Sequence, residues 1–157
     1  MRKVLILALI FGFFSCASDS PEDLVSLDLL KYGVPITIMA PDSAEVKTMD
    51  LVVQKDVSIR KGDDFYVQLF MSEASSTQSS VIAARLKGEI KSNPYFSKMI
   101  SEEESGFIFE NAIDSLKPSY DFRFVKVQGD KEYEFRTGLI GTFSLDEVEQ
   151  MYKAIKN

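Results

Sequence analysis

Apolar and polar residues alternate along several short stretches of this chain, and a period of two is typical of β-strands with one buried face. The alternating stretches are Val34–Pro41, Leu51–Arg60, Phe65–Met71, Tyr120–Phe124 and Tyr133–Phe135. A glycine-containing segment, Lys61–Asp64, joins the second stretch to the third and predicts a β-hairpin. Two further stretches, Phe96–Ser101 and Gly106–Glu110, flank the acidic segment Glu102–Glu104 and predict a hairpin with a charged tip.

Apolar residues spaced by three and four positions predict two amphipathic helices. Ile82, Leu86 and Ile90 predict the first, which we expect to end near Ser92 because Asn93-Pro94 follows. The second closes the chain, with an apolar stripe of Leu145, Val148, Tyr152 and Ile155 that begins after the capping-box pair Ser144 and Glu147. The sequence therefore predicts an α+β fold: an antiparallel sheet of about five to seven strands, a helix after the third strand and a C-terminal helix packed on the sheet.

The first residues have the pattern of a signal peptide. Arg2 and Lys3 precede an apolar run, Val4–Phe14, of about 11 residues. This run is too short to cross a bilayer, which takes about 20 apolar residues. We therefore expect a cleaved leader over residues 1–15.

The leader ends in Phe13-Phe14-Ser15-Cys16, which resembles the lipobox of bacterial lipoproteins. The resemblance implies that Cys16 is lipidated and that its acyl chains hold the protein on a lipid bilayer. Ala17 follows the cysteine in place of the aspartate that retains lipoproteins at the inner membrane, so we expect an outer-membrane anchor facing the periplasm or the cell surface. An ordinary secretory leader with an incidental cysteine is the alternative.

Three segments follow from these patterns. Residues 1–15 are expected to be the signal peptide, residues 16–32 the lipidated cysteine and an acidic tether, and residues 33–157 a single α+β domain. Within the tether, Pro21 and Gly33 are placed to begin and end a short helix.

Composition excludes several kinds of chemistry. The chain has no histidine and a single cysteine, which excludes catalysis by Ser-His-Asp or Cys-His groups. The formal net charge is −6 and no stretch clusters lysine and arginine, so nucleic acid is not an expected partner. We expect no cofactor and no metal, since Asp42–Glu45 lacks EF-hand spacing and Gly138–Gly141 lacks the lysine of a phosphate-binding loop.

The remaining candidates for chemistry are carboxylates and aromatic rings. Three acidic groups are present, Asp63-Asp64, Glu102–Glu104 and Asp146-Glu147, and we interpret them as a turn, a loop tip and a helix cap. A carboxylate-dependent hydrolase acting on envelope polysaccharide is the alternative, which requires two carboxylates in one cleft. Three aromatic residues are candidates to face a ligand if the helices leave part of the sheet open, although core packing is the commoner role: Tyr120, Phe122 and Tyr133.

Two further resemblances concern the whole chain. Tyr32–Pro35 and the closing segment Glu147–Tyr152 resemble a group of small bacterial envelope lipoproteins that have no assigned activity. The order of elements resembles the PsbP-like α+β fold, which implies an architecture and no function. The sequence thus favours a membrane-anchored, non-enzymatic binding or accessory module of the cell envelope, which contacts an envelope protein or a small ligand through one face of its sheet.

Overall fold

The computed structural model describes residues 24–114 and 117–156, which contain nine strands and two α-helices. The helices are α1 (Ser79–Lys91) and α2 (Leu145–Lys156), with a short 3-10 helix η1 (Leu30–Tyr32) near the start. The strands are β1 (Leu24–Asp28), β2 (Thr37–Pro41), β3 (Glu45–Asp50), β4 (Gln54–Lys61), β5 (Phe65–Glu73), β6 (Phe96–Glu102), β7 (Gly106–Asp114), β8 (Lys117–Gln128) and β9 (Lys131–Thr137).

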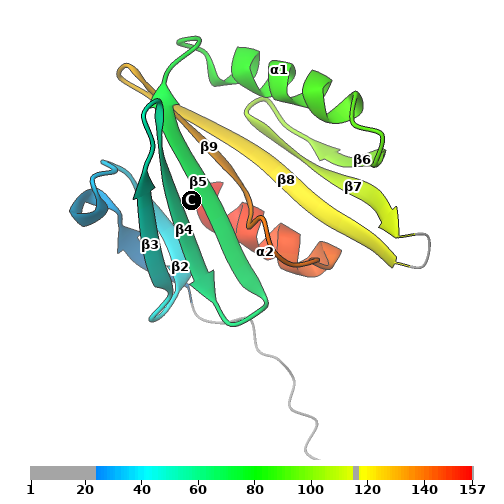
Figure 1. Ribbon diagram of the computed structural model, residues 1–157, viewed down its shortest axis with the longest axis horizontal. Coiled ribbons are helices and arrows are strands. Elements are labelled where there is room, and N and C mark those ends of the chain that lie inside the picture. The colour runs from blue at the N-terminus through cyan, green and yellow to red at the C-terminus, as the bar shows by residue number, and fades with distance from the viewer. Residues whose placement is uncertain (1–23, 115–116, 157) are drawn as a thin grey trace, which may run out of the picture.

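Seven of these strands form one antiparallel sheet in the order β3-β4-β5-β9-β8-β7-β6. β1 and β2 pair separately as an antiparallel ribbon. In Figure 1 the ribbon and α2 lie behind the large sheet, while α1 lies on its other side, beside β7 and β8. The helices therefore cover opposite faces, and α1 covers only part of its face.

Alternation along the central strands divides their side chains between these two faces. Val57, Ile59, Val67, Leu69 and Phe135 point to the α2 side and form the main core with the ribbon and α2. A smaller core lies beneath α1, where Ile82, Ala83 and Leu86 pack on Phe107, Phe109 and Val125. The polar residues between the core positions of β4, β5 and β9 consequently share the face that α1 covers only in part.

The α+β class, the antiparallel sheet and the C-terminal helix are confirmed. The capping box of α2 is also present, since the Glu147 carboxylate accepts hydrogen bonds from the Ser144 backbone N–H at 2.6 Å and from its hydroxyl at 2.7 Å. The placement of the first helix after the third strand is wrong, because α1 follows β5. The difference arises from β1 and β3, whose exposed and irregular patterns gave no strand signal.

Part of the expected tether belongs to the folded domain. Residues 24–28 form β1, and Leu24 pairs with Pro41 at one end of the ribbon. Instead of the short helix expected up to Gly33, a strand and η1 occupy the described part of that segment, and Gly33 ends η1 with a left-handed φ of 80°. The expected leader and Cys16 lie outside the described residues.

Candidate functional site

The three aromatic residues singled out as ligand-facing occupy different environments. Phe122 and Tyr133 are buried in the main core on the α2 side, with exposed fractions of 0% and 1%. Tyr120 is half-buried, and its hydroxyl donates a hydrogen bond to Glu110. Tyr120 lines a cavity where a small molecule has room, whereas Phe122 and Tyr133 are enclosed by the core.

The acidic groups singled out in the sequence are engaged in ion pairs and a helix cap. Asp63 pairs with Arg60 at 2.7 Å, and Glu102 pairs with Lys87 at 2.8 Å. Glu103 pairs with Lys156, which ties the β6–β7 turn to the end of α2. These contacts agree with the interpretation of the acidic groups as turn, loop tip and cap.

The uncovered part of the α1 side of the sheet is the most distinctive surface of the described chain. Figure 1 looks onto β3, β4 and β5 from this side, and no described element crosses in front of them. Strand register places three rows of side chains next to one another here. We call this surface the open face, and its members are Asp56, Ser58, Arg60, Tyr66, Gln68, Phe70, Glu134 and Arg136.

Arginine side chains lie over both aromatic rings of the open face. The guanidinium carbon of Arg136 is 4.2 Å from the centroid of the Phe70 ring, and that of Arg60 is 5.5 Å from the Tyr66 ring. Such contacts are favourable because the ring face is electron-rich. Arginine and aromatic residues are also the types that contribute most to binding energy at protein interfaces.

Several polar atoms at the centre of the open face have no hydrogen-bond partner. Gln68 is 4% exposed and donates from its amide to the Asp56 carboxylate at 2.7 Å, yet its own oxygen is unpaired. Asp56 Oδ1 and Arg136 Nε are also buried without a partner among the described residues. Unpaired buried polar atoms are rare in stable folds and call for a water molecule or a ligand.

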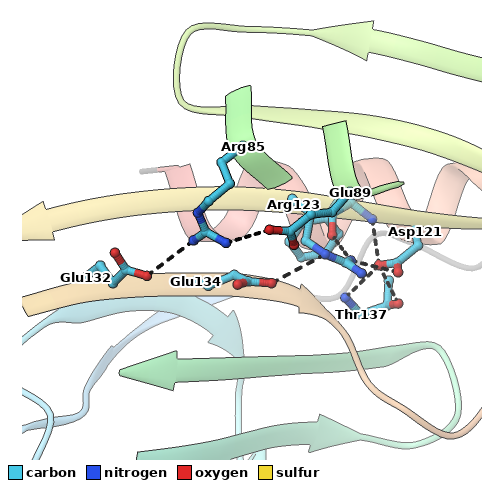
Figure 2. Close-up of polar contacts among 8 residues, drawn as sticks. Arg85, Glu89, Asp121, Arg123, Glu132, Glu134 and Thr137 are labelled. Carbon is cyan, nitrogen blue, oxygen red and sulfur yellow. Dashed lines mark hydrogen bonds and ion pairs between the residues drawn. The ribbon is translucent and has the colours of Figure 1, made fainter. Parts of the chain in front are cut away.

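A network of ion pairs joins Glu134 of the open face to β8, and Figure 2 shows its members. Arg123 on β8 is 8% exposed and contacts Asp121 Oδ2 at 2.7 Å through Nη1. Its Nε lies 3.4 Å from Glu134 Oε1 on β9. Asp121 Oδ1 in turn accepts hydrogen bonds from the Thr137 backbone N–H at 3.1 Å and from its hydroxyl at 2.8 Å.

A second group of ion pairs links β9 to α1. Arg85 on the helix contacts Glu89 at 2.8 Å and reaches Glu132 on β9 at 3.7 Å (Figure 2). The other oxygen of Glu132 accepts hydrogen bonds from the backbone and hydroxyl of Ser75, at 2.8 and 2.7 Å. Glu132 on β9 thus binds both the loop before α1, through Ser75, and the helix itself, through Arg85.

Burial shifts the pKa of two groups in this region, Glu134 and Arg136. Burial raises the pKa of Glu134, although the neighbouring Arg123 and Arg136 act in the opposite direction. Burial also lowers the pKa of Arg136, and repulsion from Arg123 adds to that effect. The carboxylates of Glu134, Asp121 and Asp56 act against this shift of the Arg136 pKa.

A small polar cavity of about 170 Å³ opens where β8 and β9 separate. Tyr120 N donates to Phe143 O at 3.2 Å and fixes the β9–α2 loop to β8, while Gly138 N donates to Tyr66 O at 2.7 Å. A Cβ atom at Gly138 would lie 2.2 Å from the Tyr66 ring, so only glycine allows this close approach. The polar side chains of the lining are Asn111, Ser119, Tyr120, Asp121, Arg123, Arg136 and Thr137.

A second, wider depression of about 610 Å³ lies at the tip of the β3–β4 hairpin. Leu51, Val52 and Val53 line it, and they are 46%, 104% and 79% exposed. An apolar tip of this kind is typical of a contact surface. The depression lies at the end of β4 opposite to Arg60. β1 begins at the Arg60 end of the domain, because Leu24 pairs with Pro41, shortly before β3.

Part of this site is predictable from the alternation of residues along the strands. The alternation within residues 120–124 and 132–136 places Asp121, Arg123, Glu134 and Arg136 on one side of neighbouring strands. The sequence therefore predicts a polar side of the sheet that meets water. Arg123 is instead buried, where it contacts the Asp121 and Glu134 carboxylates and lies over the Phe109 ring.

No helix of the described chain, residues 24–114 and 117–156, is both long and apolar enough to cross a bilayer. Over the same residues, no three side chains of the metal-binding types lie together as a metal site would require. Searches of protein-family models, curated proteins and solved structures found no match to this chain.

Proposed function

We propose that this protein is a lipid-anchored, non-catalytic binding module of the bacterial cell envelope, which contacts an envelope protein or a small ligand through its open face. The anchor follows from the lipobox-like segment that ends at Cys16. Its acyl chains would keep the domain at the membrane, because each buried methylene contributes about 0.8 kcal/mol.

The open face carries the binding part of the proposal. Phe70 and Tyr66 lie under arginines in the middle of a sheet, on a side where water-facing strands ordinarily present short polar or charged residues. Gln68, between them in the strand, is buried with an unpaired oxygen. This combination adds little to the stability of a fold, because unpaired buried polar groups cost about 1–3 kcal/mol each.

The alternative, a hydrolase that uses a carboxylate pair, receives no support from the acidic groups that suggested it. Asp63, Glu102 and Glu103 each pair with a basic residue at the surface. Glu147 caps α2. Their positions favour structural roles.

Site-specific photo-crosslinking in intact cells tests the proposed binding face. A photoreactive residue at Ser58, on the open face beside Gln68, is expected to give a discrete adduct whose mass identifies a protein or a small molecule. The control places the same residue at Glu149, which is exposed on α2 on the other side of the sheet. Absence of an adduct at Ser58, or the same adducts at both positions, would contradict a binding role for the open face.

A further inference from the structure

Arg136 differs from the other arginines near the open face. Arg60, Arg85 and Arg123 each contact a carboxylate at 2.7 or 2.8 Å. No carboxylate or other hydrogen-bond acceptor among residues 24–114 and 117–156 contacts Arg136, and its Nε is buried. A half-buried guanidinium without an acceptor is unfavourable for folding, because burial removes water from the charge and no direct ion pair offsets that loss.

The position of Arg136 leaves its donors available to a ligand. The guanidinium carbon of Arg136 lies 4.2 Å from the centroid of the Phe70 ring. Such a contact is made by the positive charge, so the guanidinium N–H groups can still donate to an acceptor. Arg136 also lines the 170 Å³ cavity between β8 and the β9–α2 loop, where a small molecule has space.

From this arrangement we infer that the cavity binds the carboxylate group of a small organic acid or of a peptide C-terminus, with Arg136 as the residue that holds it. The inference rests on the proposed function and specifies one ligand class for the binding module. A carboxylate matches the planar pair of donors that a guanidinium offers.

The charges around the cavity favour a monoanion over a dianion. Arg123 and Arg136 line it as cations, and Asp121 is its one acidic lining residue. Asp121 is bonded to Arg123 and also acts on Arg136, although it makes no contact with it. Glu134 and Asp56 act on Arg136 from outside the lining, so a phosphate dianion would meet more repulsion than a carboxylate.

Titration followed by NMR of the ¹⁵N-labelled full chain tests this assignment directly. Acetate is expected to give saturable shifts of the Arg136 Nε–H signal and of the Thr137 and Gly138 amide signals. Acetamide, which lacks the charge, and inorganic phosphate are expected to bind at least ten-fold more weakly than acetate. A tripeptide with a free C-terminus, compared with its C-terminal amide, shows whether a peptide carboxylate enters the cavity or only a free acid does.

Matched variants separate the role of Arg136 from a general effect of charge. Arg136→Gln is expected to weaken acetate binding at least ten-fold, and Arg136→Lys to restore it only in part, because lysine lacks the planar pair of donors. Arg85→Gln removes an arginine of α1 that pairs with Glu89 and lies outside both the open face and the cavity lining, and it is expected to leave binding unchanged. Wild-type shifts centred away from Arg136, tighter binding of phosphate or equal binding by Arg136→Gln would overturn the assignment.

This test and the crosslinking at Ser58 can fail separately. A discrete adduct at Ser58 without acetate binding would overturn the carboxylate site and leave the open face as a binding surface. Acetate binding at Arg136 without an adduct would uphold the carboxylate site and contradict the wider contact through the open face.

Discussion

Asp121 connects two strands and a loop at the edge of the candidate site. One oxygen binds Arg123, and the other accepts from Thr137 and from the Phe122 backbone N–H at 2.7 Å. Both members of the ion pair are largely enclosed, with side-chain exposures of 10% and 19%. The pair thus lies where loss of one partner leaves the other charge poorly solvated.

Asp121→Asn is therefore expected to lower the free energy of unfolding by about 2 kcal/mol. The measurement is urea unfolding followed by circular dichroism. Asp63→Asn is the matched control, because the Arg60–Asp63 pair is exposed and is expected to contribute less than about 1 kcal/mol. Equal effects of the two substitutions would show that enclosure of the Asp121 pair has no energetic consequence.

Glu134 predicts a defined pH dependence. Its pKa is raised in the folded protein, so the native state binds its proton more tightly than the unfolded state does. Its contribution to stability is complete below the ordinary value of 4.5 and declines as pH rises through the raised folded value. Arg85, Glu89, Arg123 and Arg136 are the charged groups that face it.

The stability of Glu134→Gln relative to wild type should accordingly increase as pH rises from about 4 to 7. Urea unfolding of both proteins at several pH values gives this difference. The other ionisable groups are the same in both proteins, so their pH effects cancel in the comparison. A difference that stays constant with pH, or that decreases, would contradict a raised pKa.

Elements with one buried face were predictable from their alternation. Val57 and Ile59 in β4, and Val67 and Leu69 in β5, alternate with polar residues and point into one core. β3 was not predictable, because it is an edge strand whose residues are almost all exposed, so no face needs to be apolar. The position of α1 over β7 and β8 was not predictable either, since it depends on packing between distant segments, Ile82 and Leu86 on Phe107 and Phe109.

α2 depends on a cap that the sequence also predicts. Ser144 and Glu147 bond to each other reciprocally at the start of the helix. Ser144→Ala should lower the free energy of unfolding by about 1 kcal/mol, because it leaves a backbone N–H of the first turn without a partner. Thermal and urea unfolding measure the change, and Ser79→Ala, in the first turn of α1 where Gln78 holds the cap position, is the control with a smaller expected effect.

At the scale of the whole molecule, the first described residue, Leu24, and the apolar hairpin tip lie at opposite ends. β1 begins with Leu24, paired to Pro41, at the end of the sheet that holds Arg60. Val52 is at the far end of β4, at the hairpin tip.

Labelling cells with palmitate tests the anchor. The wild-type chain should incorporate the label, and Cys16→Ser should lose it and leave the membrane fraction, since the thiol is the expected attachment atom. Ser18→Ala keeps the cysteine and should remain labelled and membrane-bound. A Cys16→Ser protein that stays with the membranes, without gaining solubility in water, would contradict the proposed lipidation.

The central claim is that the open face is built to bind, and that Arg136 serves a ligand and not the fold. The most direct test is the free energy of unfolding of Arg136→Met, measured with urea in the absence of any added carboxylate. Methionine fills similar space against Phe70 and removes an unpaired buried donor, so we predict an unchanged stability or a gain of about 1 kcal/mol. A loss of about 2 kcal/mol or more would show that Arg136 maintains the fold, and would contradict the account.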